Sequence, residues 1–191
     1  MTYYDDDMYP VQFNVDYPEE PRNRLTTLVR IILAIPVILV LVFLQLIIIS
    51  TILMILFRKK YPRWWFDFNL ELLRFSARVN SYVLLLRDEY PATDDEQAVH
   101  LDIAYPDPEQ LNRFMPLIKW LLAIPHYVVL FVLGIISLIV TFIAWLAILI
   151  TGSYPRGLFN FVVGVSRWEN RVNAYAFALT TDRYPPFRLE E

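Results

Sequence analysis

The chain has 191 residues, of which 57% are hydrophobic and 19% charged, and its formal net charge is −3. Soluble domains usually carry about a quarter of charged residues, so this composition predicts an integral membrane protein. The absence of cysteine excludes disulfides, iron–sulfur clusters and a cysteine nucleophile. The four glycines fit no nucleotide-binding loop, and His100 and His126, the two histidines, cannot form a metal-binding pair at helical spacing.

Acidic residues gather at the start of the chain and again near its middle. Residues 1–21 and 88–109 hold fourteen of the twenty acidic residues and no Lys or Arg. We interpret residues 1–8 as an acidic N-terminal tail and 93–96 as an acidic linker. The basic residues crowd the ends of the apolar runs instead, where lipid headgroups are expected. Because they form no broad basic face, membrane lipids and not nucleic acid are the expected partners.

Two long apolar runs dominate the sequence. Residues 31–57 carry no charge, and residues 120–151 carry none unless the histidine among them is protonated. A bilayer core about 30 Å thick needs roughly 20 helical residues, so both runs exceed one crossing. A proline disfavours helix in the residue before it, and one proline lies near the start of each run. The prolines therefore predict transmembrane spans of about 36–57 and 125–151, each preceded by a short turn.

The second half of the chain repeats the first. The sequence Leu-Ala-Ile-Pro ends at Pro36 and recurs ending at Pro125. Further matches lie on both sides, including a Tyr-Pro-Arg after each apolar run. A match of this extent at one period indicates a duplicated unit. The chain is therefore predicted to consist of two membrane modules, residues 9–92 and 97–188.

Each module is predicted to begin with a strand and end with a helix. Residues 11–15 and 99–103 alternate between apolar and polar side chains, as half-buried strands do. Second helices are expected at about 64–87 and 157–180. Their narrow polar stripe suits either a helix lying in the membrane interface or a return span. Residues 187–189 alternate again and predict a last strand.

The expected fold is an all-α integral membrane protein with short extramembrane β-strands, built from a duplicated module of strand, transmembrane helix and amphipathic helix. If the strands pair, both ends of each module lie on one face of the membrane. That arrangement favours an even number of crossings per module, or hairpins.

Three segments of the second module resemble a known family. They are PLIKWLLAIPHYVVLF from Pro116, YPRGLFNFVVGVSRW from Tyr154 and TDRYPPF from Thr181, and they are similar to a bacterial membrane family catalogued only as domain of unknown function 4389. The resemblance covers nearly the whole chain, although the first module has Val37 at the position of the family's histidine. It also has Arg-Trp-Trp at 63–65 in place of Arg-Gly-Leu. The resemblance implies a membrane protein and supplies no reaction, cofactor or catalytic residue.

Four arginines at matched positions of the two second helices form the candidate site: Arg74, Arg78, Arg167 and Arg171. Three interpretations are open. Their long side chains could extend to the membrane interface. Their guanidinium groups could bind anionic lipid headgroups or phosphate. They could also form a polar path through a helix bundle, which would indicate transport.

His126 stands at the head of the second predicted span, where the first module has Val37. An interfacial histidine is the expectation, and a proton-relay or metal-binding role is the alternative.

The residues offer no combination of nucleophile, base and orienting group, so neither enzymatic activity nor a cofactor is predicted. We expect a non-enzymatic accessory or scaffolding subunit that crosses the bacterial inner membrane more than once. It would pack against a larger membrane complex, form a homo-oligomer or organise lipid, and its aromatic content of 16% suits such packing. One alternative is a small oligomeric transporter or channel that uses the arginine-bearing helices. Another is a lipid-modifying enzyme with His126 at the interface.

Overall fold

A computed structural model describes residues 9–45, 53, 54, 57, 62–93, 95–105 and 114–190. In chain order the elements are β1 (Val11–Val15), α1 (Arg24–Leu28), α2 (Arg30–Gln45), α4 (Arg63–Val83), β2 (Val99–Ile103), α5 (Met115–Leu122), α6 (Ile124–Thr151) and α7 (Arg156–Ala176). The described chain is mostly helical, with one two-stranded sheet. The predicted acidic tail and most of the first predicted span beyond Gln45 lie outside the described residues.

The two strands pair as equivalent parts of the two modules. β1 and β2 run antiparallel, with Phe13 opposite Leu101 at the centre. In both strands the alternate side chains are buried and those between them are exposed or half-buried, which confirms the predicted strands. Phe13 and Leu101 occupy matched positions of the two modules and face each other at the centre of the antiparallel pair. A local two-fold axis through the sheet therefore relates the modules.

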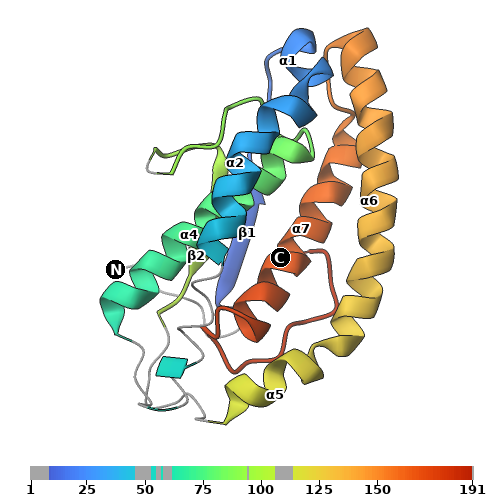
Figure 1. Cartoon of the computed structure of the whole chain (residues 1–191). Coiled ribbons are helices and arrows are strands. Elements are labelled where there is room, and N and C mark those ends of the chain that lie inside the picture. The colour runs from blue at the N-terminus through green and yellow to red at the C-terminus, as the bar shows by residue number, and fades with distance from the viewer. Residues whose placement is uncertain are drawn as a thin grey trace.

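The helices form two layers over the apolar face of the sheet. β1 packs on α7 and β2 packs on α4, so each strand covers the amphipathic helix of the other module. On the side away from the sheet, α2 packs on α4 and α6 packs on α7 (Figure 1). The main core lies between the sheet and the helices α4 and α7. The layers are therefore the sheet, then α4 with α7, then α2 with α6.

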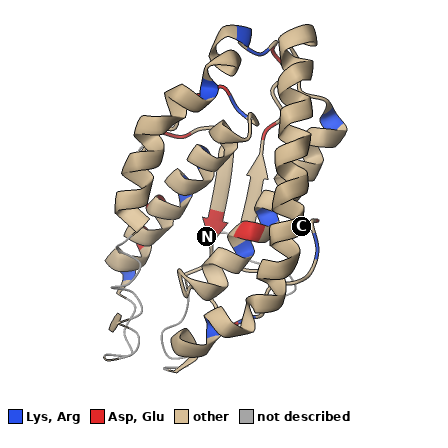
Figure 2. Ribbon diagram, turned by 45° about the vertical axis from the view of Figure 1, so that its right-hand side comes forward, with Lys and Arg blue, Asp and Glu red and all other residues tan. Residues whose placement is uncertain are grey.

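The α6 helix is the one described element long and apolar enough to cross a membrane. It has 28 residues, a mean hydropathy of 2.8 in its most apolar window and no Lys, Arg, Asp or Glu. Figure 2 shows it without a coloured charged position along its length. Most of this apolar surface is not covered by the rest of the chain. The described part of α2 is also apolar but shorter, at 16 residues.

The predicted helix break before each proline holds in one module only. In the second module α5 ends at Leu122 and α6 begins at Ile124, with Pro125 in its first turn, as predicted. In the first module the predicted break is wrong, because Pro36 lies inside α2. The break falls earlier, at Val29, and α2 packs on α4 through Arg30 before the proline and Val37 after it. This packing offsets the backbone hydrogen bond that a proline removes.

The second helices of both modules end earlier than the sequence predicts. α4 ends at Val83 and α7 at Ala176, four residues before the predicted ends. Leu85 and Leu179 follow with φ of 61° and 57°. Left-handed backbone at a leucine is uncommon and ends a helix without the usual glycine, so the sequence carries no signal for these turns.

The predicted last strand at residues 187–189 is not present in the described chain. This segment lies against α7, where the carbonyls of Arg188, Leu189 and Glu190 accept hydrogen bonds from arginine side chains. Because the arginines supply these donors, the segment needs no strand partner.

Gly164 permits the close approach of the C-terminal segment to α7. A Cβ added there would lie 3.0 Å from Cβ and 3.2 Å from the carbonyl oxygen of Leu189. Gly164→Ala is therefore expected to lower the free energy of unfolding by about 1–3 kcal/mol, the usual cost of overpacking. Hydrogen exchange of residues 183–190 should rise in the variant. Gly157→Ala on the same helix is the control, because its Cβ would meet nothing within 4 Å; equal losses in both variants would refute the packing explanation.

Candidate functional site

Two of the four predicted arginines tie each amphipathic helix to the strand of the other module. Arg74 on α4 donates from Nε to the carbonyl of Leu101, at 2.9 Å. Arg167 on α7 donates from Nε to the carbonyl of Phe13, at 2.8 Å. Leu101 and Phe13 are the paired central residues of the sheet. The two contacts are therefore equivalent under the local two-fold axis, and they form a cross-module clamp.

The partners of the remaining N–H groups of Arg74 and Arg167 differ between the modules. Arg74 forms ion pairs with Glu71 at 2.7 Å and with Asp102 at 2.6 Å. Arg167 instead donates to the carbonyl of Leu189, at 2.9 Å. Burial acts to lower the pKa of Arg74, but the hydrogen bonds that it donates to the two carboxylates raise this pKa above its ordinary value. Its charge is therefore retained beside the sheet.

The other two predicted arginines are more deeply buried. Arg78 donates to the carbonyl of Ala92 at 2.9 Å, and Arg171 donates to the carbonyl of Glu190 at 2.7 Å. Arg78 also lines a cavity of about 250 Å³ with Arg74 and residues of β2. The two arginines of each helix thus lie on the sheet side of the molecule. Binding of a lipid headgroup there stays a prediction.

Two buried cations, which sequence reasoning did not single out as a site, are Arg30 at the start of α2 and Lys119 in α5. Arg30 is 2% exposed, forms an ion pair with Asp88 and donates to the carbonyl of Arg87, at 2.7 Å. Lys119 is 1% exposed and forms an ion pair with Asp182 at 2.6 Å. It donates to the carbonyl immediately before that aspartate, also at 2.7 Å. The available signal was that Arg30 and Lys119 each lie six residues before the proline of the repeated Leu-Ala-Ile-Pro sequence.

Each buried cation also lies over a tyrosine. The guanidinium carbon of Arg30 is 4.2 Å from the ring centre of Tyr82, and Nζ of Lys119 is 5.2 Å from that of Tyr175. Burial lowers the pKa of Lys119, and Asp182 partly offsets this. In the first module burial likewise lowers the pKa of Arg22, to about 10, beside Asp88. Two modules with different cations thus build the same arrangement.

His126 is fully buried, where the sequence suggested an interfacial side chain. Its Nδ1 accepts a hydrogen bond from Nε1 of Trp168 at 3.1 Å, and its ring stacks on Phe187 at 4.0 Å. In the first module Val37 packs instead in an apolar cluster with Phe75. Among the described residues, no group of three or more His, Asp or Glu is placed to hold a metal ion. The contacts of His126 are therefore those of a packed core residue.

The pair His126–Trp168 is expected to show energetic coupling. His126→Val leaves the buried indole N–H without its acceptor and should cost about 1–3 kcal/mol. Adding Trp168→Phe to the His126→Val variant removes the indole donor. The double variant then has a valine beside a phenylalanine, as Val37 lies beside Phe75 in the first module. Part of the lost stability should therefore be recovered. Thermal unfolding of the four proteins of this cycle measures the coupling. Strictly additive losses would show that the hydrogen bond contributes nothing.

A polar groove opens between α2 and the helices α4 and α7. It has a volume of about 220 Å³, and Asn80, Asn173 and Glu169 contribute to its lining beside Ile38 and Leu41. Desolvation raises the pKa of Glu169. A raised carboxyl pKa favours the neutral acid, which suits a groove next to apolar helices.

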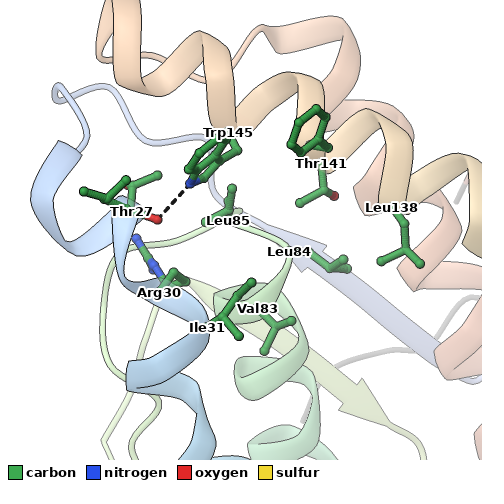
Figure 3. Close-up of a pocket in the computed structure, with 11 residues that line it drawn as sticks. Thr27, Arg30, Ile31, Val83, Leu84, Leu85, Leu138, Thr141 and Trp145 are labelled. Carbon is green, nitrogen blue, oxygen red and sulfur yellow. Dashed lines mark hydrogen bonds between the residues drawn. The ribbon is translucent and has the colours of Figure 1, made fainter.

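A largely apolar cavity beside α6 is suited to hydrocarbon. It has a volume of about 360 Å³ and lies between the start of α2, the end of α4 and the second half of α6 (Figure 3). Leu84, Leu138 and Phe142 contribute to its walls. At one end, Nε1 of Trp145 donates to the carbonyl of Thr27 at 3.1 Å and fixes α6 against α1. This geometry can accommodate part of an acyl chain.

Comparison with known proteins identifies a family but no characterised relative. No curated protein and no solved structure matches the chain. A family model described as a domain of unknown function, DUF4389, matches residues 24–93 and again residues 116–188. The family model matches the chain twice, which confirms the predicted duplication. The chain therefore belongs to the DUF4389 family and carries its domain twice.

Proposed function

We propose that this protein is a non-enzymatic accessory or scaffolding subunit of the bacterial inner membrane, which packs against a larger membrane complex or organises lipid. The exposed apolar surface of α2 and α6 carries this proposal. Phe43, Phe131 and Ile150 are each more than 70% exposed. A contiguous apolar surface of this kind marks a site of contact with protein or membrane.

The polar contacts of the described residues support a structural role. The arginines of α4 and α7 hold the two modules together, and the buried cations hold the segments that follow α4 and α7. The result is a rigid polar layer beneath an apolar one. A scaffold needs such rigidity, because its partners bind to a fixed surface.

The cavity of about 360 Å³ supports the role in organising lipid. Filling it should reduce lipid binding while leaving the polar contacts in place. Leu138→Trp places an indole at the cavity wall, whereas Leu146→Trp, on the same helix, changes a residue outside the lining. Fewer retained lipids in the first variant alone would support binding in the cavity, and equal retention in both would contradict it.

Native mass spectrometry of the protein, purified from its own membrane in mild detergent, tests the proposal. A stoichiometric larger partner, or retained lipid, is expected. A lone monomer free of lipid would contradict it. The crossing of the membrane by two helices stays a prediction from the sequence, and labelling experiments described below address it.

A further inference from the structure

The tyrosines on either side of β1, Tyr9 and Tyr17, connect the strand to the chain near the two ends of α6. At one end the hydroxyl of Tyr9 donates to the carbonyl of Arg183 at 3.1 Å. The hydroxyl of the adjacent Tyr184 donates to the carbonyl of Leu122, the last residue of α5, just before α6 begins at Ile124. At the other end the hydroxyl of Tyr17 donates to the carbonyl of Tyr154, which lies shortly after the end of α6 at Thr151. The sheet therefore lies alongside the middle of α6 and not beyond either end (Figure 1).

The outer face of this sheet is polar. His100 and Asp16 lie 3.0 Å apart on it, and both side chains are more than half exposed. Asp102 is 61% exposed. If α6 crossed a bilayer, these groups and the outer edges of a two-stranded sheet would lie near the bilayer midplane. Open sheet edges and exposed charges are not tolerated facing hydrocarbon.

Charge is segregated between layers, not along the helix axis. A transmembrane bundle places its charges beyond the two ends of its helices. Here the arginines Arg74 and Arg167 lie at the centre of the sheet, level with the middle of α6. The layer formed by α2 and α6, here called the outer layer, has no Lys, Arg, Asp or Glu in α6 or in the described part of α2 after its first residue. Glu169 of α7 is exposed and lines both the groove below α2 and a second groove beside α6, and desolvation raises the pKa of its carboxyl.

Basic and aromatic side chains stand at the margin of the outer layer. Arg24 and Arg156 are exposed near the C-terminal end of α6, and Trp120 is 53% exposed near its N-terminal end. Arginine and tryptophan are the side chains favoured at headgroup level. The length of α6, about 42 Å at 1.5 Å per residue, also exceeds the roughly 30 Å of a bilayer core. The thickness of the bilayer does not limit the length of a helix that lies in the plane of the membrane.

We propose that α2 and α6 lie in the plane of the membrane, within one leaflet, with the sheet in water and the local two-fold axis along the membrane normal. The face that contacts acyl chains includes Ile31, Phe43, Phe131, Ile139, Phe142 and Ile150, all exposed. Both ends of α6 then lie on the same side of the membrane. This inference rests on the proposed membrane location and replaces the two crossings expected from the sequence.

The chain contains no cysteine, so single cysteines can be placed without a prior deletion. Ser153→Cys reports on one end of α6, Arg183→Cys on the other, and His100→Cys on the sheet; all three positions are exposed. Sealed spheroplasts and inverted vesicles are treated with a membrane-impermeant maleimide. All three variants are expected to react from one side only, and from the same side. Reaction of Ser153→Cys and Arg183→Cys from opposite sides would overturn the proposal in favour of a crossing.

Ile139→Cys, on the exposed apolar face of α6, tests what covers that face. A bimane attached there is expected to be quenched by phosphatidylcholine brominated along its acyl chains, in reconstituted vesicles. Absence of quenching would overturn lipid contact and indicate a second copy or a partner protein on this face. Release of the protein from membranes by alkaline carbonate would refute membrane embedding itself. Native mass spectrometry tests the subunit role separately, so the two proposals can fail independently.

Discussion

Lys119→Met is expected to lower the free energy of unfolding by about 3 kcal/mol. This figure is at the low end for removing one partner of a buried ion pair, because Asp182 keeps 28% of its side chain exposed. The substitution retains the length of the side chain but leaves Asp182 and the carbonyl of Thr181 without their shared donor. Thermal and denaturant unfolding in detergent, followed by tryptophan fluorescence, measures the loss.

Lys119→Arg is the matched control, because Arg30 already fills the equivalent position of the first module. It is expected to retain most of the stability lost in Lys119→Met. The converse variant, Arg30→Lys, should likewise be milder than Arg30→Met. If Lys119→Arg were as damaging as Lys119→Met, the equivalence of the two modules at this position would be wrong.

The cross-module clamp gives the second large effect. Arg74→Met and Arg167→Met each leave the carbonyl of a central strand residue without its side-chain donor. Each is expected to cost about 1–3 kcal/mol, as for a buried acceptor that loses its partner. The double variant should lose about the sum, and hydrogen exchange should rise in both strands.

Arg156→Met provides the control for the clamp, since that side chain is 68% exposed and pairs with an exposed Glu19. Exposed pairs contribute about 0–1 kcal/mol, so its stability should change little. The same variants test the predicted headgroup role. Loss of bound anionic lipid from Arg74→Met at unchanged stability would favour that role over the clamp.

The repeat was the strongest sequence signal, and residues at matched positions of the repeat make equivalent contacts in the structure. Matched residues became matched contacts: the strand centres pair, and Arg30 and Lys119 occupy the same setting over Tyr82 and Tyr175. What the sequence did not reveal was that Arg74 of one module contacts the strand of the other. Helical spacing defines the face on which a side chain lies, but not the element that covers this face.

The misplaced boundaries have a similar cause. Pro36 is tolerated inside α2 because that helix packs on α4, and Leu85 and Leu179 adopt left-handed backbone that local sequence does not favour. In each case tertiary packing outweighed the local preference of one residue. His126 was misjudged for the same reason, since the C-terminal segment that covers it lies about sixty residues further along the chain.

The sequence by itself determined the duplication, the two strands, the long apolar helix of the second module and the family. These features depend on composition, period and neighbouring residues, which can be read directly along the chain. The tertiary structure decided that the modules exchange strands, that the arginines lie on the sheet side, and that the sheet lies beside the middle of α6. Those features depend on contacts between residues as far apart as Phe13 and Arg167, and only the packed layers bring such residues together.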